Sequence, residues 1–120
     1  MENVSLTDLT SEQLEAARQT SSGRASRTVY GGQEHSLRQT LIALVAGQEL
    51  AEHENPGEAT VHVLRGRVDL SAEGEVASGS PGDLLVVPDM RHALRAVEDS
   101  VVILTVAKRV PDPSGPSPRP

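Results

Sequence analysis

The chain has 120 residues, with 17 acidic against 11 basic side chains, a net charge of −6 and no cysteine. This length predicts one domain around one hydrophobic core. The acidic balance, with Tyr30 as the sole Phe, Tyr or Trp residue, argues against direct nucleic-acid binding, because phosphate backbones attract basic surfaces. Disulfides and thiolate metal ligands are excluded. No apolar run reaches the roughly 18 residues of a membrane span, and the N-terminus lacks a signal-peptide pattern, so we expect a cytoplasmic protein without membrane contact.

Residues 1–26 are predicted to form a short helix followed by a linker. Thr10 is the expected N-cap, and Gln13 stands at the third helical position, which is a capping-box pattern. Leu9 and Leu14 flank this start at the spacing of a hydrophobic staple. Good helix formers continue to Gln19, and the Thr-Ser-Ser-Gly sequence that follows ends the helix.

Residues 27–108 are predicted to form a β domain, because short apolar runs alternate with Gly- and Pro-containing turns. Without Phe and Trp, its core must come from Val, Leu, Ile and Ala, and the β-branched members of this set favour strands. Many short strands between such turns are typical of a sandwich or barrel. The clearest apolar runs are 37–45, 60–64, 84–87 and 100–107.

Residues 109–120 alternate proline with Ser, Gly, Asp and Arg. Such a segment buries too little apolar surface to offset the entropy of ordering it, so we expect a disordered tail. The alternative is a polyproline II segment that docks on a partner.

Two segments of the β domain each contain one histidine in a distinctive setting. Gly47 to Gly66 includes His53, and Gly82-Asp83 is followed by four apolar residues, Pro88 and His92. Together they resemble the two motifs of the cupin superfamily, over about two-thirds of the chain. The resemblance implies a double-stranded β-helix (a jelly-roll barrel) in which both motifs face one mouth. In many cupins, two His and one Glu of the first motif and one His of the second bind a divalent metal there.

The sequence departs from that motif at two of the four ligand positions. Asn55 stands where the second His is usual, and the usual Glu position aligns near Ala59 or Thr60, with Glu58 slightly early. His53, Glu58 and His92 would still make a set of two imidazoles and one carboxylate, with Asn55 as an additional oxygen donor. That set suits Fe, Mn, Ni or Zn and leaves coordination positions open.

A structural reading of these histidines stays open beside the metal site. His53 would then be an exposed residue of a polar loop, and His92 would hydrogen-bond only to nearby backbone. His62 lies between two valines and should face away from the core if they face it. His35 is expected in a solvated loop, and the arginines that flank His92, at 91 and 95, should face solvent.

Two functional classes follow from this reading. We favour a binding module that holds a metal ion, a small molecule or both in the barrel mouth without turnover. The alternative is a metal-dependent cupin enzyme, of dioxygenase, isomerase or decarboxylase type. A weaker hypothesis is a regulator that acts through protein contacts of its N-terminal helix or its tail. The run 101–106, which is apolar on both faces, and the habits of the family also predict a homodimer.

Overall fold

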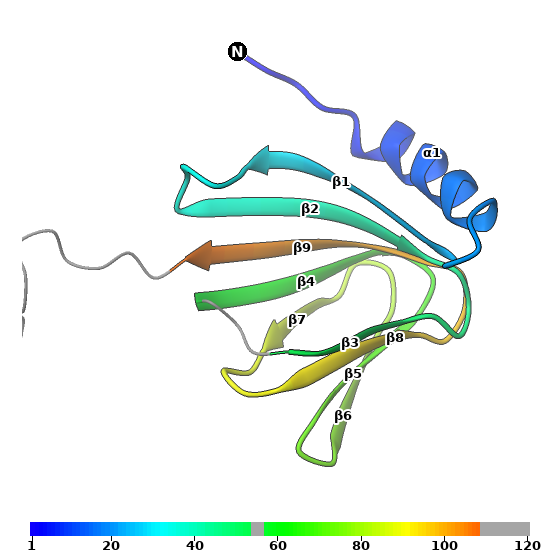
Figure 1. The fold of residues 1–120 in the computed structure, drawn as a ribbon, viewed down its shortest axis with the longest axis vertical. Coiled ribbons are helices and arrows are strands. Elements are labelled where there is room, and N and C mark those ends of the chain that lie inside the picture. Colours follow the sequence, from blue (N-terminus) through cyan, green and yellow to red (C-terminus); the bar gives the residue numbers. More distant parts are fainter. Residues whose placement is uncertain (54–56, 109–120) are drawn as a thin grey trace, which may run out of the picture.

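The computed structural model describes residues 1–53 and 57–108, with the backbone alone at 51–53. Within these residues the chain forms one helix followed by nine strands (Figure 1). None of the described helices is long and apolar enough to cross a membrane. The elements are α1 (Leu6–Arg18), β1 (Arg24–Gly31), β2 (Leu37–Leu44), β3 (Glu49–His53), β4 (Gly57–Arg65), β5 (Val68–Ala72), β6 (Glu75–Gly79), β7 (Leu84–Val87), β8 (His92–Ala96) and β9 (Ser100–Lys108).

The strands form two antiparallel sheets that face one another, in the order β1-β2-β9-β4-β7 and β3-β8-β5-β6 (Figure 1). Apolar side chains from both sheets fill the space between them and make the main core. This two-layer jelly roll confirms the predicted mainly-β barrel with one N-terminal helix. The core residues are Ile42, Leu44, Ala59, Val61, Val63, Val68, Leu70, Val87, Leu94, Ala96, Val102 and Val106.

Helix α1 begins about one turn earlier than predicted. Its N-cap is Ser5, whose hydroxyl accepts the Asp8 backbone N–H at 3.2 Å. Thr10 therefore lies inside the helix, and the prediction of a Thr10 cap is wrong. Serine is at least as favourable as threonine at the N-cap. The earlier start also places Asp8 in the first turn, where the helix dipole favours a negative charge. Leu9 and Leu14 are both buried, in a cluster that includes sheet residues.

The helix covers the outer face of the five-stranded sheet (Figure 1). Side chains of β2 alternate, so that Leu41 and Ala43 pack with the helix while Ile42 and Leu44 point into the main core. Strand β9 alternates in the same way. The two-sided apolarity of residues 101–106 is therefore explained within one chain, and the predicted homodimer no longer has this observation behind it.

Strand β1 begins at Arg24, so its first residues lie in the segment predicted as a linker. Its alternation is weak as a signal because Arg27 interrupts the face on which its apolar residues lie. Ala25 and Val29 pack with the helix cluster, whereas Arg24, Ser26 and Thr28 lie opposite inward-facing positions of β2. The tail, 109–120, lies outside the described residues.

Asp99, in the bend between β8 and β9, ties the helix to the barrel. Its carboxylate accepts the Ala46 N–H at 2.9 Å and the Arg18 Nε–H at 3.0 Å. These donors, the backbone N–H of Ala46 first and the guanidinium of Arg18 second, lower the pKa of Asp99 from its ordinary value of 3.8. The acidic pair Glu98-Asp99 therefore includes a residue that anchors the helix to the barrel.

Asp99→Ala is expected to lower the free energy of unfolding by about 1 kcal/mol at neutral pH, since one backbone hydrogen bond and a partly exposed ion pair are lost. Because the pKa is lower in the folded state, the stabilisation is present above the unfolded pKa. It is lost as pH falls through the folded pKa. Urea unfolding at neutral pH and at acid pH measures both effects. The neighbouring exposed Glu98→Ala is the control, and an equal loss there would contradict this role for Asp99.

Candidate metal and ligand site

A small cavity lies between the two sheets and contains one imidazole. Its volume is about 20 Å³, which is room for about one water molecule. His92 is the single titratable side chain in this lining among the residues that the structure describes. The other lining residues are apolar: Ile42, Leu50, Val61, Leu70, Val87, Leu94, Val102 and Leu104.

The His92 ring is buried, with 6% of the residue exposed, and one of its nitrogens contacts backbone. Nδ1 lies 2.8 Å from the carbonyl oxygen of Met90. Because a carbonyl can only accept, Nδ1 carries a proton in this bond, and in the neutral ring the lone pair is then on Nε2. The backbone bond expected in the structural reading is therefore present. It also selects the tautomer in which metal-binding imidazoles are usually held, donating from the nitrogen that does not bind the metal.

The turn before β8 sets this hydrogen bond. The Met90 N–H donates to the Pro88 carbonyl at 2.9 Å, which closes a tight turn. Two residues later the chain enters β8 at His92. The position of the Met90 carbonyl thus follows from the connection between β7 and β8, and not from either sheet.

The backbone brings position 53 opposite His92. His53 is the last residue of β3, and its Cα partner in the antiparallel register with β8 is His92. A register irregularity separates this pair from the Leu50–Leu94 pair of the same two strands. The side chain of His53, and all of Asn55, lie outside the described residues. The two motif segments therefore meet at neighbouring positions of one sheet.

Glu58 is not brought together with His92. It is the second residue of β4 and is exposed, while Gly57 and Ala59 on either side of it are buried. Strand alternation therefore puts Glu58 on the outer face of the five-stranded sheet and Ala59 in the core. Among the described residues, no group of three or more His, Asp or Glu side chains could hold a metal ion. Every second residue of a strand lies on the same face, and Glu58 is three residues before the buried Val61. The sequence alone could therefore have predicted that Glu58 faces outward.

The remaining candidates lie where the sequence predicted. His62 is exposed on the outer face of β4, opposite Ile103. His35 is exposed in the turn between β1 and β2, and its ring meets that of Tyr30 edge-on at a centroid distance of 5.6 Å. Arg95 is exposed on β8, between two buried residues.

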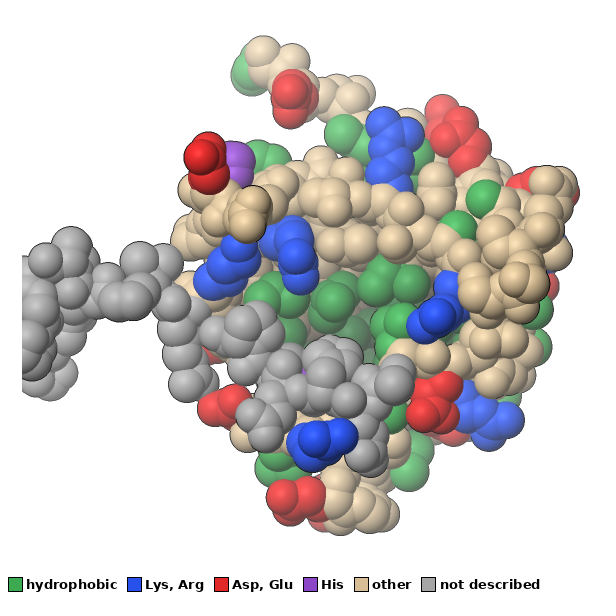
Figure 2. Space-filling view, viewed as in Figure 1, with side chains coloured by type: hydrophobic (Ala, Val, Ile, Leu, Met, Phe, Trp, Pro, Cys, Tyr) green, Lys and Arg blue, Asp and Glu red, His purple; other side chains and the backbone are tan. Residues whose placement is uncertain are grey.

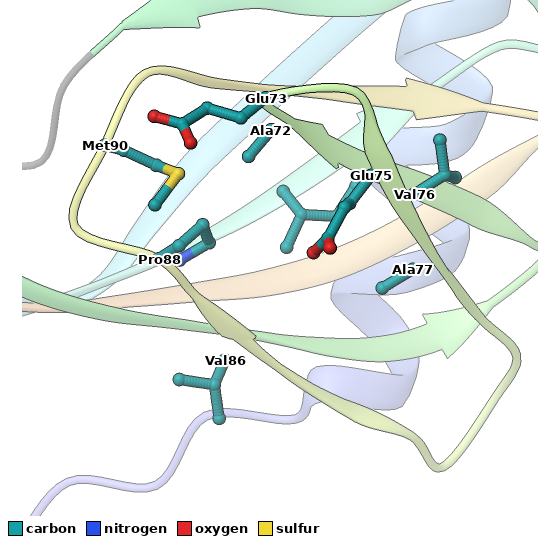
Figure 3. A pocket seen from close by; sticks show the side chains of 9 residues that line it. Ala72, Glu73, Glu75, Val76, Ala77, Val86, Pro88 and Met90 are labelled. Carbon is teal, nitrogen blue, oxygen red and sulfur yellow. The ribbon is translucent and has the colours of Figure 1, made fainter.

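A larger groove, of about 390 Å³, lies beside the edge strands β6 and β7 (Figure 3). Its lining is mostly apolar, including Val76, Val86 and Met90, with Glu73 and Glu75 also present. Figure 3 shows Met90 on one side of the groove and Val76 on the other. Met90 thus lines the groove and also accepts the hydrogen bond from His92.

Comparison with known proteins identifies the family to which this chain belongs. A family model described as a cupin domain matches residues 40–107, more than half of the chain. The chain belongs to the cupin family. The match spans both motif segments, and this cupin therefore has the fold that the resemblance implied. Among curated proteins, none is similar enough to count as a match.

Solved structures show the same fold. A conserved protein of unknown function from Streptococcus pyogenes is 32% identical, with 92% of each chain covered and a TM-score of 0.74. An RmlC-like cupin protein from Desulfovibrio desulfuricans is 30% identical, with 70% of this cupin and 81% of that chain covered and a TM-score of 0.61. A cupin superfamily protein from Desulfitobacterium hafniense is 18% identical, with 72% and 78% covered and a TM-score of 0.66, and supports the fold alone.

Proposed function

We propose that this cupin binds a divalent metal ion together with a small molecule at the mouth of its barrel, without converting that molecule. The observation that carries the proposal is the buried ring of His92, whose Nδ1 is engaged by the Met90 carbonyl at 2.8 Å. A ring held in this way presents Nε2 as the ligand atom. His53, at the opposed backbone position, is the second proposed ligand.

The donor set fits a metal that accepts imidazole nitrogen, which Fe, Mn, Ni and Zn all do. Glu58 is not a member of this set, because its strand position directs it outward. Asn55 is the further oxygen donor in the proposal. Water and the bound molecule would complete the coordination, as at metal sites that keep open positions.

The character of the cavity favours binding over turnover. General acid–base catalysis needs a positioned titratable group within hydrogen-bond reach of the reacting atoms. In the described lining, His92 is surrounded by apolar side chains such as Val87 and Leu94. The described lining therefore offers an imidazole to a bound metal and no second titratable group to act as acid or base.

Elemental analysis of the purified, tag-free protein tests the proposal. We expect near-stoichiometric Fe, Mn, Ni or Zn in the wild type and its loss in His53→Ala/His92→Ala, because both proposed nitrogen ligands are removed. His62→Ala removes an exposed histidine on the outer face and should retain the metal. Circular dichroism checks that each variant is folded, and His53→Ala alone replaces the double variant if that one unfolds.

Three outcomes would contradict the proposal. The metal site is wrong if the folded double variant keeps its metal, or if a metal-free wild type also takes up none when it is added. Reproducible metal-dependent turnover of a small substrate would instead overturn binding without conversion and support a cupin enzyme.

A further inference from the structure

The inner face of the five-stranded sheet changes character towards its β1–β2 edge. Over β9, β4 and β7 this face is apolar and forms the core. On β2, Arg38 pairs with Val106 and Thr40 pairs with Leu104, and both partners belong to or pack against that core. Arg38 and Thr40 therefore lie on the inner face. Thr28 of β1 is the Cα partner of Thr40 and continues the same polar strip.

This edge of the barrel is open. A cleft of about 370 Å³ is lined by residues of β1 and its approach, by Ile42 of β2 and by Leu50 of β3. Figure 2 shows this face hollowed, with apolar side chains at the bottom of the hollow and Lys or Arg side chains at its margins. A polar molecule can therefore reach the inner face where β1 begins and β2 ends. Arg38, at the other end of β2, does not line this cleft and is itself exposed.

Arg38 lies at the same end of the barrel as His92. Strand β2 starts, β3 ends and β8 starts at this end (Figure 1). Arg24 is opposite Leu44, six residues further along β2 from Arg38, which is about 20 Å at strand spacing. Arg38 is thus the inner-face arginine at the mouth, whereas Arg24 lines the cleft at the opposite end of the two strands.

The charge of Arg38 is not balanced within the described part of the chain. Both ion pairs found there involve Arg18 and not Arg38. The described inner-face residues of β1 and β2 include no carboxylate. Arg38 is exposed and has no acidic neighbour among the described residues of these two strands. In a protein of net charge −6, such a guanidinium makes this part of the mouth locally favourable to anions.

We propose that the small molecule bound in the mouth carries a carboxylate or phosphate group, and that Arg38 is the residue that binds this anion. The planar guanidinium offers parallel N–H donors that match both groups. The Thr40 and Thr28 hydroxyls lie on the same face and supply further donors. The inference rests on the proposed function, since it names the chemical class of the molecule that the mouth takes.

NMR titration of the full-length protein with inorganic phosphate, with acetate and with neutral acetamide tests this inference. Arg38→Gln keeps most of the side-chain length and removes the charge. It should weaken binding of the favoured anion about tenfold, as expected for hydrogen bonds to a charged group. Arg27→Gln is the matched control, because Arg27 is an exposed arginine of β1 whose partner, Leu41, packs with the helix on the outer face.

The two anions distinguish the two sources of charge. A loss confined to phosphate identifies a phosphorylated ligand, and a loss confined to acetate identifies a carboxylic acid. The inference is overturned if Arg38→Gln binds both anions as the wild type does, if Arg27→Gln weakens binding equally, or if acetamide binds as well as acetate. Metal retention is measured separately by elemental analysis. If the proposed metal site proves wrong, this titration still tests the role of Arg38 on its own.

Discussion

Gly66→Ala is expected to lower the free energy of unfolding by about 3 kcal/mol, by combining backbone strain with a steric clash. Gly66 forms the turn between β4 and β5 with a φ of 82°, a conformation that side chains with a Cβ disfavour. A Cβ at this position would also meet the backbone oxygen of Asp99 and the hydroxyl of Ser100.

Neither contact can move aside at low cost. Ser100 is fully buried, and its hydroxyl accepts the Arg67 N–H at 3.0 Å. The same hydroxyl lies 2.7 Å from the Glu98 carbonyl, to which it can donate. Displacing it would break these part-buried hydrogen bonds and shift the start of β9, which pairs with both β2 and β4.

Urea unfolding of Gly66→Ala and Gly74→Ala separates the two causes. Gly74 has the same φ of 82°, but nothing lies within 4 Å of a Cβ built there. Gly74→Ala should therefore show the backbone strain alone, about 1–2 kcal/mol. If both variants lose the same stability, the contact with Ser100 contributes nothing and the explanation by crowding is wrong.

Leu14→Ala is expected to cost about 3 kcal/mol, the typical loss for a leucine truncated in a packed core. Leu14 is 1% exposed and belongs to the cluster formed between α1 and the outer face of the sheet. Its removal would leave a cavity among Leu41, Val101 and Ile103, which belong to the same cluster.

The control for this prediction is Leu6→Ala, on the same helix. Leu6 is 39% exposed, so its truncation should change the free energy of unfolding by about 0.5 kcal/mol or less. Chemical denaturation of the two variants measures the difference. A small loss for Leu14→Ala would mean that the helix adds little stability and that the outer face of the sheet tolerates exposure.

Local patterns in the sequence were sufficient for much of the fold. The apolar run of β2 and the turn at Glu73-Gly74, where both residues have positive φ, were predictable because each depends on a few adjacent residues. Strand β1 was only partly predicted because Arg27 interrupts its apolar face, which leaves Ala25 and Val29 as the apolar positions there. The start of α1 was misplaced because Ser5 and Thr10 are equally acceptable as caps.

The candidate site was also only partly predictable from the sequence. The spacing of the two motifs pointed to positions 53 and 92, and the register places them opposite each other. The tautomer of His92 was not predictable, because it depends on where the turn places the Met90 carbonyl. Arg38 lies in a segment dominated by apolar residues, and its inward direction follows only from the pairing of β2 with the distant strand β9.

Strands β2 and β9 lie between two separate hydrophobic cores and contribute side chains to both. One core is formed with the second sheet and the other with α1. Successive residues along either strand therefore belong to different packing units. Two substitutions in the same core share neighbours, so their effects on the free energy of unfolding should be coupled. Two substitutions in different cores should have effects that are more nearly additive. The interior around His92 can thus change in sequence with little effect on how the helix is held.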